Sequence, residues 1–295
     1  MYLYHFGLRE LPFTLTPNTN FFLGLPSYNQ ALETLLTALM AGEGFIKLVG
    51  EVGLGKTLLC RKLLKELPNH FATAYIPNPY LKPDELRWAV ASELGVELNA
   101  DVNQQQLTEL IHQRLMQLHQ QGHSVVLILD EAQAIPEESL EALRLFTNLE
   151  TENRKLLQVV MFGQPELDAR LKQDHLRQLR QRITFSYELK ALSEKEVGEY
   201  IQHRLNKAGA LNADLFNTTH CRKIARASRG IPRVINILCH KSLLLCYGQG
   251  RQEVNRKDLS LAIKDTQDAH GIKWLSWLPL GICVMLSMSA GYWMV

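Results

Sequence analysis

Short apolar runs alternate with segments of helical spacing over the first two thirds of the chain. The runs at 45–49, 125–129 and 156–162 are apolar almost throughout, which is typical of parallel strands buried on both faces. Between them, apolar residues recur every three or four positions, as in amphipathic helices. This alternation predicts an α/β fold, a parallel sheet sandwiched by helices. We expect strands at 45–49, 72–76, 124–129, 156–162 and 183–189, and helices at 28–40, 58–65, 83–94, 105–119, 139–149 and 175–182.

After Ala191 the pattern changes to helices only, which predicts a small all-helical domain. Ser193 and Glu196 form a capping box, and Asn255 is a good N-cap. The expected helices are 195–208, 221–228, 233–247 and 256–266. The predicted organisation is an N-terminal segment at 1–25 that packs on the α/β core, the α/β domain at 26–190 and the helical domain at 191–268.

The segment 274–295 contains no charged residue and has aromatic residues near both ends, such as Trp274 and Trp293. As a helix it would extend about 33 Å, enough to cross a hydrocarbon core of about 30 Å. Lys264 and Lys273 precede it, so the positive-inside rule places the preceding domains in the cytoplasm. The sequence therefore predicts a single transmembrane helix. The alternative is a buried C-terminal helix of the core.

The composition is that of a globular protein, with 46% hydrophobic and 21% charged residues. A formal net charge of +2 gives no strong electrostatic attraction for nucleic acid, which makes a nucleic-acid partner unlikely. The five cysteines form no C-x-x-C pair, which argues against a zinc site. The N-terminus lacks the features of a secretory signal.

One glycine-rich stretch, Gly50 to Thr57, fits the phosphate-binding pattern G-x-x-x-x-G-K-[ST]. It lies between a predicted strand and a predicted helix, as this loop requires. Lys56 would reach the β- and γ-phosphates of ATP, and the Thr57 hydroxyl would bind Mg²⁺. The alternative is a glycine-rich turn without a ligand. The residues expected to contact ATP are Gly50, Glu51, Val52, Gly53, Leu54, Gly55, Lys56, Thr57 and Leu58.

Two carboxylates, Asp130 and Glu131, end the next long apolar run. Asp130 would hold Mg²⁺, and Glu131 would orient and polarise the attacking water. A solvated acidic pair is the alternative. Gln164 ends the following apolar run and is a candidate contact for the γ-phosphate or the water, or else a turn residue before Pro165.

Arginines form two further candidate groups. The first group consists of Arg177, Arg180 and Arg182. It has three interpretations: a solvated helix face, an anion-binding patch or the source of an arginine finger. Such a finger reaches from a neighbouring subunit and stabilises the transition state. For the finger we favour Arg182, then Arg180. Arg233, in Gly-Ile-Pro-Arg, begins a predicted helix and would bridge the helical domain to the γ-phosphate. A surface arginine is the alternative.

Over residues 1–268 the chain resembles an AAA+ ATPase. It carries, in the order typical of that class, the glycine-rich loop, the acidic pair, Gln164, the arginines at 180 and 182, and Arg233. Four stretches resemble one particular family within this class, the general secretion pathway A family. They are 4–13, Thr16-Pro-Asn18, Asp130-Glu-Ala-Gln133 and 163–167. The resemblance implies a cytoplasmic AAA+ domain followed by a membrane helix, in type II secretion or type IV pilus assembly.

The implied activity is slow ATP hydrolysis with Mg²⁺ at the bacterial inner membrane. Slow turnover is expected because Gln164 stands where Asn or Thr is commoner in AAA+ proteins. The resemblance implies a homo-oligomer with ATP between subunits and partners among pilus or secretion proteins. The family's secretion members continue into a periplasmic peptidoglycan-binding domain, and a chain ending at its membrane helix is expected in the short, MSHA-like pilus branch.

Two other functions remain open at this point. A DNA-associated ATPase of the transposition-helper type would contact phosphates through basic residues of the helical domain. Those residues are Arg222, Lys223, Arg226 and Arg229. A nucleotide-dependent scaffold with little turnover is the other.

Overall fold

The computed structural model describes residues 2–97, 102–146, 155–210 and 215–269. These residues divide into two compact units. The α/β unit comprises Thr14–Ala191 together with Ile231–Arg233. The helical unit comprises the described residues among 2–13, Leu192–Gly230 and 234–269.

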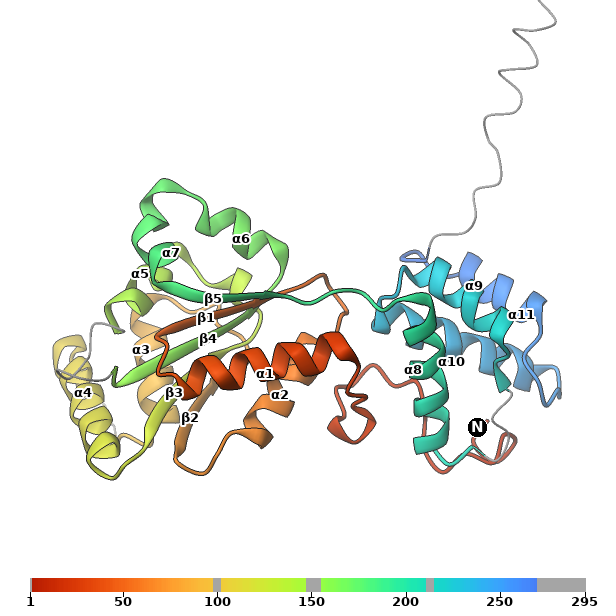
Figure 1. Ribbon diagram of the computed structural model, residues 1–295, viewed down its shortest axis with the longest axis horizontal. Helices are drawn as coiled ribbons and strands as arrows, with labels where there is room; N and C mark the ends of the chain where they lie inside the picture. Colours follow the sequence, from red (N-terminus) through yellow and green to blue (C-terminus); the bar gives the residue numbers. More distant parts are fainter. Residues whose placement is uncertain (1, 98–101, 147–154, 211–214, 270–295) are drawn as a thin grey trace, which may run out of the picture. The chain divides into compact units, whose positions relative to one another are not determined.

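The α/β unit is built on a five-stranded, entirely parallel sheet with the order β2-β3-β4-β1-β5 (Figure 1). The predicted α/β class is therefore confirmed. The strand that enters the glycine-rich loop, β1, lies between β4 and β5, so the loop emerges from the interior of the sheet. The strands are β1 (Phe45–Val49), β2 (Phe71–Ile76), β3 (Ser124–Leu129), β4 (Leu157–Gly163) and β5 (Ile183–Glu188).

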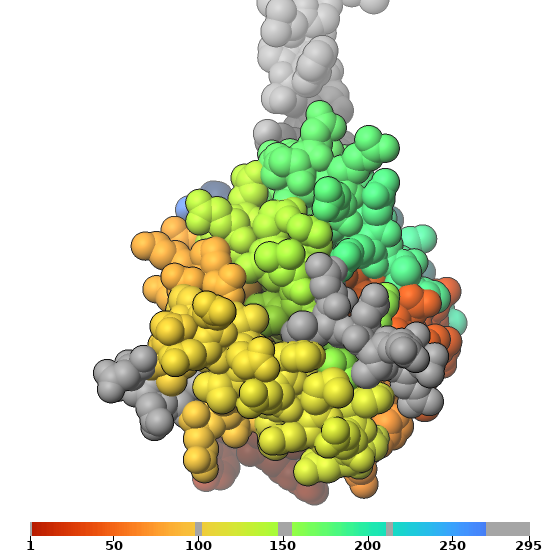
Figure 2. Space-filling model, turned by 90° about the vertical axis from the view of Figure 1, so that its left-hand side faces the viewer, coloured from red at the N-terminus to blue at the C-terminus, as the bar shows by residue number. Residues whose placement is uncertain are grey.

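Helices cover both faces of this sheet. One face packs against α3, α4 and α5, whose apolar residues form a continuous core with alternate residues of the strands, such as Val125, Leu127 and Leu129. The other face contacts α1 and α2 (Figure 1). In Figure 2, α3 and α4, in orange and yellow, form much of the visible surface. The helices are α1 (Pro26–Met40), α2 (Lys56–Glu66), α3 (Pro83–Glu93), α4 (Gln104–Gln120), α5 (Glu137–Phe146), α6 (Pro165–Leu171) and α7 (Arg177–Arg182), with 3-10 turns η1 (Thr19–Phe21), η2 (Ala132–Ala134) and η3 (Asp174–Leu176).

The helical unit contains α8 (Glu194–Lys207), α9 (Thr218–Ser228), α11 (Arg256–Lys264) and most of α10 (Pro232–Gly248). Side-chain oxygens of Ser193, Asn217 and Asn255 accept backbone N–H groups at the starts of α8, α9 and α11. These caps satisfy donors that a helix cannot satisfy internally and fix where each helix begins.

The N-terminal segment divides between the two units, which corrects the expectation that all of 1–25 packs on the α/β core. Residues 2–13 group with the helical unit, and residues 14–25 group with the α/β unit. The fully buried Tyr2 explains the difference, because its hydroxyl lies 2.9 Å from Nδ1 of His240 in α10. Tyr2, Phe6 and Phe13 are buried and contribute to the core of the helical unit.

The expected transmembrane segment, 274–295, lies outside the described residues. Within the part of the chain that the structure describes, no helix is both long and apolar enough to cross a bilayer.

Candidate nucleotide-binding site

The glycine-rich loop connects the end of β1 with the start of α2. Gly53 and Gly55 have φ angles of 83° and 91°, in the left-handed region that disfavours residues with a Cβ. Gly55 is the N-cap of α2, so the first N–H groups of that helix face the loop, as in anion-binding sites. Leu54 is buried and anchors the loop, while Glu51 and Val52 are exposed.

Lys56, the first residue of α2, is only 4% exposed. Its ammonium group donates hydrogen bonds to the carbonyl oxygens of Gly50 at 2.7 Å and Glu51 at 3.0 Å. Burial lowers the pKa of Lys56, and the carboxylates of Glu131 and Asp130 act in the opposite direction. The side chain is thus folded against the loop, close to the two predicted acidic residues.

Asp130, directly after β3, is 2% exposed. Burial raises its pKa, while hydrogen bonds from the Thr57 side chain and the Glu131 backbone N–H act to lower it. The two residues predicted to bind Mg²⁺ therefore contact each other. No cluster of three or more Asp, Glu, His or Cys among the described residues could hold a metal ion. The pair instead fits Mg²⁺, which commonly binds one or two protein oxygens together with waters and phosphate oxygens.

Glu131 adopts a left-handed backbone conformation, with φ of 53° and ψ of 40°. Its Oε2 accepts a hydrogen bond of 2.6 Å from the Gln133 side-chain amide and one of 3.1 Å from that of Gln164. The Gln133 side-chain oxygen accepts the backbone N–H of Gln164 at 3.0 Å. Arg170 donates to the Gln133 carbonyl at 2.6 Å, which further fixes this residue. Two amides from neighbouring strand ends thus hold the carboxylate.

Gln164 is the residue expected at this position, and the structure brings it to Glu131. Gln133 is a site residue to which the sequence analysis gave no role. The available signal was its position, two residues after Glu131 in a short turn.

Arg233 also reaches the loop, although it lies far along the chain. Its backbone N–H donates to the Gly53 carbonyl at 3.1 Å. A Cβ at Gly53 would stand 2.7 Å from Cβ of Arg233 and 3.1 Å from Cγ2 of Ile231. Gly53 thus permits both the backbone turn and the close approach of this segment. The Arg233 side chain itself is exposed.

The two finger candidates make hydrogen bonds to main-chain carbonyls. Arg182 donates to Arg144 at 3.0 Å. Arg180 donates to Lys172 at 3.0 Å and to Leu171 at 3.4 Å. These bonds tie both guanidinium groups to the end of α5 and the end of α6, and a finger role stays a prediction.

Tyr28, in α1, is a second site residue to which the sequence analysis gave no role. Its hydroxyl donates a 2.5 Å hydrogen bond to the Leu54 carbonyl, and its ring edge lies 3.8 Å from where a Cβ of Gly55 would stand. The side chain therefore supports the glycine-rich loop from beneath. Sequence spacing alone indicated only a helical position.

The chain is similar to known proteins in sequence and in fold. A family profile for an AAA domain matches residues 39–171. Among solved structures, the chain is similar to Cdc6p from Pyrobaculum aerophilum (TM-score 0.66, 18% identity, covering 85% of this chain and 71% of that chain). It is also similar to the Aeropyrum pernix ORC2 protein (0.61, 16%, 88% and 73%) and to the Thermotoga maritima RuvB Holliday junction branch migration motor (0.54, 20%, 86% and 73%). At these identities the likeness shows the fold alone.

Fold and profile together define a P-loop protein of the AAA+ class. General secretion pathway protein A from Aeromonas hydrophila is 39% identical over 297 residues, which cover 99% of this chain and 54% of that relative. The chain belongs to the general secretion pathway A family of AAA+ proteins, and it spans about half the length of this relative.

Proposed function

We propose that the chain binds ATP with Mg²⁺ at the loop from Gly50 to Thr57 and hydrolyses it slowly. The observation that carries this proposal is the meeting of Lys56, Thr57, Asp130 and Glu131 at the carboxyl edge of the sheet. Ligands of open α/β sheets bind outside this edge.

Each residue then has a part in the reaction. The Lys56 ammonium exchanges its two carbonyl partners for phosphate oxygens. Thr57 and Asp130 would hold Mg²⁺, which neutralises charge on the phosphates when bound. Glu131 orients a water and accepts its proton as the water oxygen bonds to the γ-phosphorus, while the bond to the β,γ-bridging oxygen breaks and ADP leaves. The Gln164 amide keeps the Glu131 carboxylate in place.

Two substitutions in the purified full-length chain test the assignment. Lys56→Ala should abolish ATP binding, and Glu131→Gln should retain binding while turnover falls by about 10²-fold or more. The matched controls are Lys62→Ala and Glu66→Gln, which make the same two changes of residue type at positions of α2 away from the proposed site. If Glu131→Gln releases phosphate as fast as wild type, Glu131 is not the base. If Lys56→Ala binds ATP with unchanged affinity, the loop from Gly50 to Thr57 is not the ATP-binding site.

We further propose that residues 274–295 anchor the protein in the bacterial inner membrane as a single pass, with the two units in the cytoplasm. The charge-free apolar sequence of that segment supports this. The test is fractionation of cells followed by protease treatment of spheroplasts. An N-terminal tag should sediment with membranes and stay protected, and a tag recovered in the soluble fraction would refute the anchor.

The use of ATP hydrolysis is proposed from the relative's name. A protein of the general secretion pathway is 39% identical, which supports a role in secretion. Within that role we propose type II secretion or the assembly of a type IV, MSHA-like pilus. We propose a homo-oligomer with ATP at its subunit interfaces, in which Arg182 or Arg180 acts on the neighbour's ATP. Co-purification from native membranes should recover secretion or pilus proteins. Recovery of DNA in their place would refute this assignment.

A further inference from the structure

A basic groove lies within the helical unit, between α9 and α11. It encloses about 1380 Å³, which exceeds the roughly 300–1,000 Å³ of a pocket for one small ligand. Its size therefore favours an extended binding partner over a single small molecule. The charged residues that line it are all basic: Arg222, Lys223, Arg226, Arg256 and Lys264.

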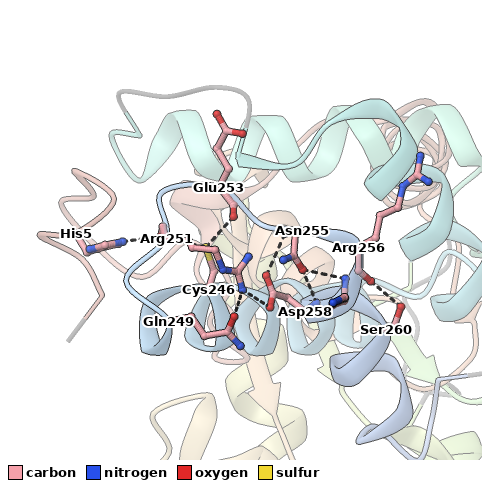
Figure 3. Close-up of polar contacts among 10 residues, drawn as sticks. His5, Cys246, Gln249, Arg251, Glu253, Asn255, Arg256, Asp258 and Ser260 are labelled. Atoms are coloured by element: carbon pink, nitrogen blue, oxygen red, sulfur yellow. Dashed lines mark hydrogen bonds and ion pairs between the residues drawn. The ribbon is translucent and has the colours of Figure 1, made fainter.

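Most of the nearby carboxylates are paired with basic residues. Asp265 pairs with Lys241 at 2.8 Å, outside the groove lining, whereas the exposed Asp268 opposes part of the positive charge. Asp258 is 1% exposed on its side chain and pairs with Arg251 at 2.6 Å. Figure 3 shows Asp258 facing Arg251 and Asn255, while the guanidinium of Arg256 points away from that cluster. Glu194 pairs with Arg222 at 3.3 Å, but both side chains are about half exposed, so the pairing is weak.

Other contacts give the groove a fixed shape. Lys223 donates a 2.6 Å hydrogen bond to the Ser260 hydroxyl, which links the two helices while leaving the ammonium charge in place. His220 lines the groove and is 5% exposed, and its Nδ1 is buried without a hydrogen-bond partner. Burial, followed by the charges of Arg256 and Lys223, lowers the pKa of His220. The positive charge of the groove is thus carried by arginine and lysine.

The groove combines these cations with an apolar lining of Ala227, Ile263 and Ala269. Nucleic-acid backbones offer phosphates to cations, whereas a phospholipid offers a phosphate joined to an apolar chain. The charge-free apolar segment begins at Trp274, five residues after Ala269. Five extended residues span at most about 17 Å, so a membrane entered at Trp274 would hold its headgroups close to the groove.

We infer that this groove binds the headgroups of anionic phospholipids in the leaflet from which the membrane segment departs. The inference rests on the proposed membrane attachment. Basic residues beside a membrane segment are attracted by anionic headgroups, and each is worth about fivefold in affinity. The contact would hold the helical unit against the membrane surface.

The test uses the full-length chain in dodecylmaltoside, titrated with phosphatidylglycerol or phosphatidylcholine and followed by native mass spectrometry. Phosphatidylglycerol should bind more tightly. The double variant Arg226→Glu/Lys264→Glu should weaken that binding by about thirtyfold or more and leave phosphatidylcholine unchanged. The matched double variant Lys207→Glu/Lys257→Glu makes the same charge change at exposed positions outside the groove lining and should behave as wild type. If the glutamate variant does not fold, Arg226→Gln/Lys264→Gln replaces it.

Equal affinity for the two lipids would overturn the inference, and so would loss of the preference in the control variant. Binding of duplex DNA that the groove variant abolishes, without a lipid preference, would assign the groove to nucleic acid instead. Lys56→Ala should lose ATP binding and keep the lipid preference. If the chain hydrolyses ATP normally but does not prefer phosphatidylglycerol, the lipid-binding role of the groove is refuted. If the chain prefers phosphatidylglycerol but does not hydrolyse ATP, the proposed ATPase activity is refuted. Recovery of the cellular protein in the soluble fraction would refute the anchor separately.

Discussion

Replacing Gln133 by leucine tests whether the amide contacts at Glu131 position the carboxylate that we propose as the catalytic base. Leucine has a similar size but lacks the amide. The substitution removes the 2.6 Å hydrogen bond to Glu131 and takes the acceptor from the Gln164 backbone N–H. We expect turnover to fall while ATP affinity stays unchanged, because Gln133 touches the carboxylate and not the glycine-rich loop.

The magnitude follows from the contact itself. A hydrogen bond to a charged group contributes about 1.5–3 kcal/mol. Gln133 and Glu131 are half-buried, so water can replace part of the interaction, and about 1–2 kcal/mol remains. Each 1.36 kcal/mol corresponds to a tenfold change in rate, so kcat should fall by about 5- to 30-fold.

The assay is phosphate release at saturating Mg·ATP, with nucleotide affinity measured on the same preparations. Gln117→Leu, on the exposed side of α4, is the matched control and should leave kcat unchanged. Gln133 and Gln164 donate to the same oxygen of Glu131, so the double leucine variant should lose less than the product of the single losses. A kcat within twofold of wild type would refute the positioning role. A raised kcat would refute it as well, and would show that the amides withhold the carboxylate from water.

Three further outcomes follow from the structure. Gly53→Ala should weaken ATP binding by at least about tenfold and lower Tm, because the added Cβ would stand 2.7 Å from another segment of the chain. Gly42→Ala, also at positive φ but with open space around it, should cost only about 1–2 kcal/mol of strain. Nucleotide titration and thermal unfolding compare the two variants, and equal effects would contradict the steric argument. Tyr28→Phe leaves the carbonyl of Leu54 without its donor and should lower the free energy of unfolding by about 1–3 kcal/mol, measured by urea denaturation; no change would show that water replaces the hydroxyl. Asp130→Asn should raise Tm at pH 7–8, because burial raises the pKa of Asp130 and the charged carboxylate therefore costs stability at that pH. The gain in Tm should shrink as the pH falls through this raised pKa, which lies above the ordinary value of 3.8. A difference in Tm that does not depend on pH would contradict the reasoning.

The sequence predicted the sheet well where strands are buried on both faces. The runs that became β1, β3 and β4 lie in the interior of the sheet, and burial on both faces leaves only apolar residues acceptable there. The edge strand β5 is partly exposed but still apolar enough to be recognised. Helix α6 was not predicted, because Pro165 follows closely on a strand and was assigned to no helix. Proline is also favoured in the first turn of a helix, and here it starts one.

The candidate site was predictable where its residues adjoin in sequence and not where they meet only in space. Lys56 and Thr57 follow the glycines directly, and Asp130 and Glu131 follow a strand, so the local pattern places them. The bond from Tyr28 to the loop joins residues 26 positions apart, and no periodicity marks it. Such contacts depend on how helices pack on the sheet, which a single sequence does not specify.

The position of Glu131 shows how strand order completes what the motif leaves open. A left-handed backbone costs a residue with a Cβ about 1–2 kcal/mol, so surrounding contacts must hold it. Those contacts come from Gln133, beyond β3, and Gln164, beyond β4. The two strands are neighbours, with Leu129 beside Met161, so residues shortly after each strand end are brought within hydrogen-bonding distance. The motif supplies the carboxylate, and the register of β3 against β4 supplies the amides that set its direction. The geometry of the proposed base is therefore a property of the sheet, which is why we expect Gln133→Leu to alter turnover without touching the nucleotide loop.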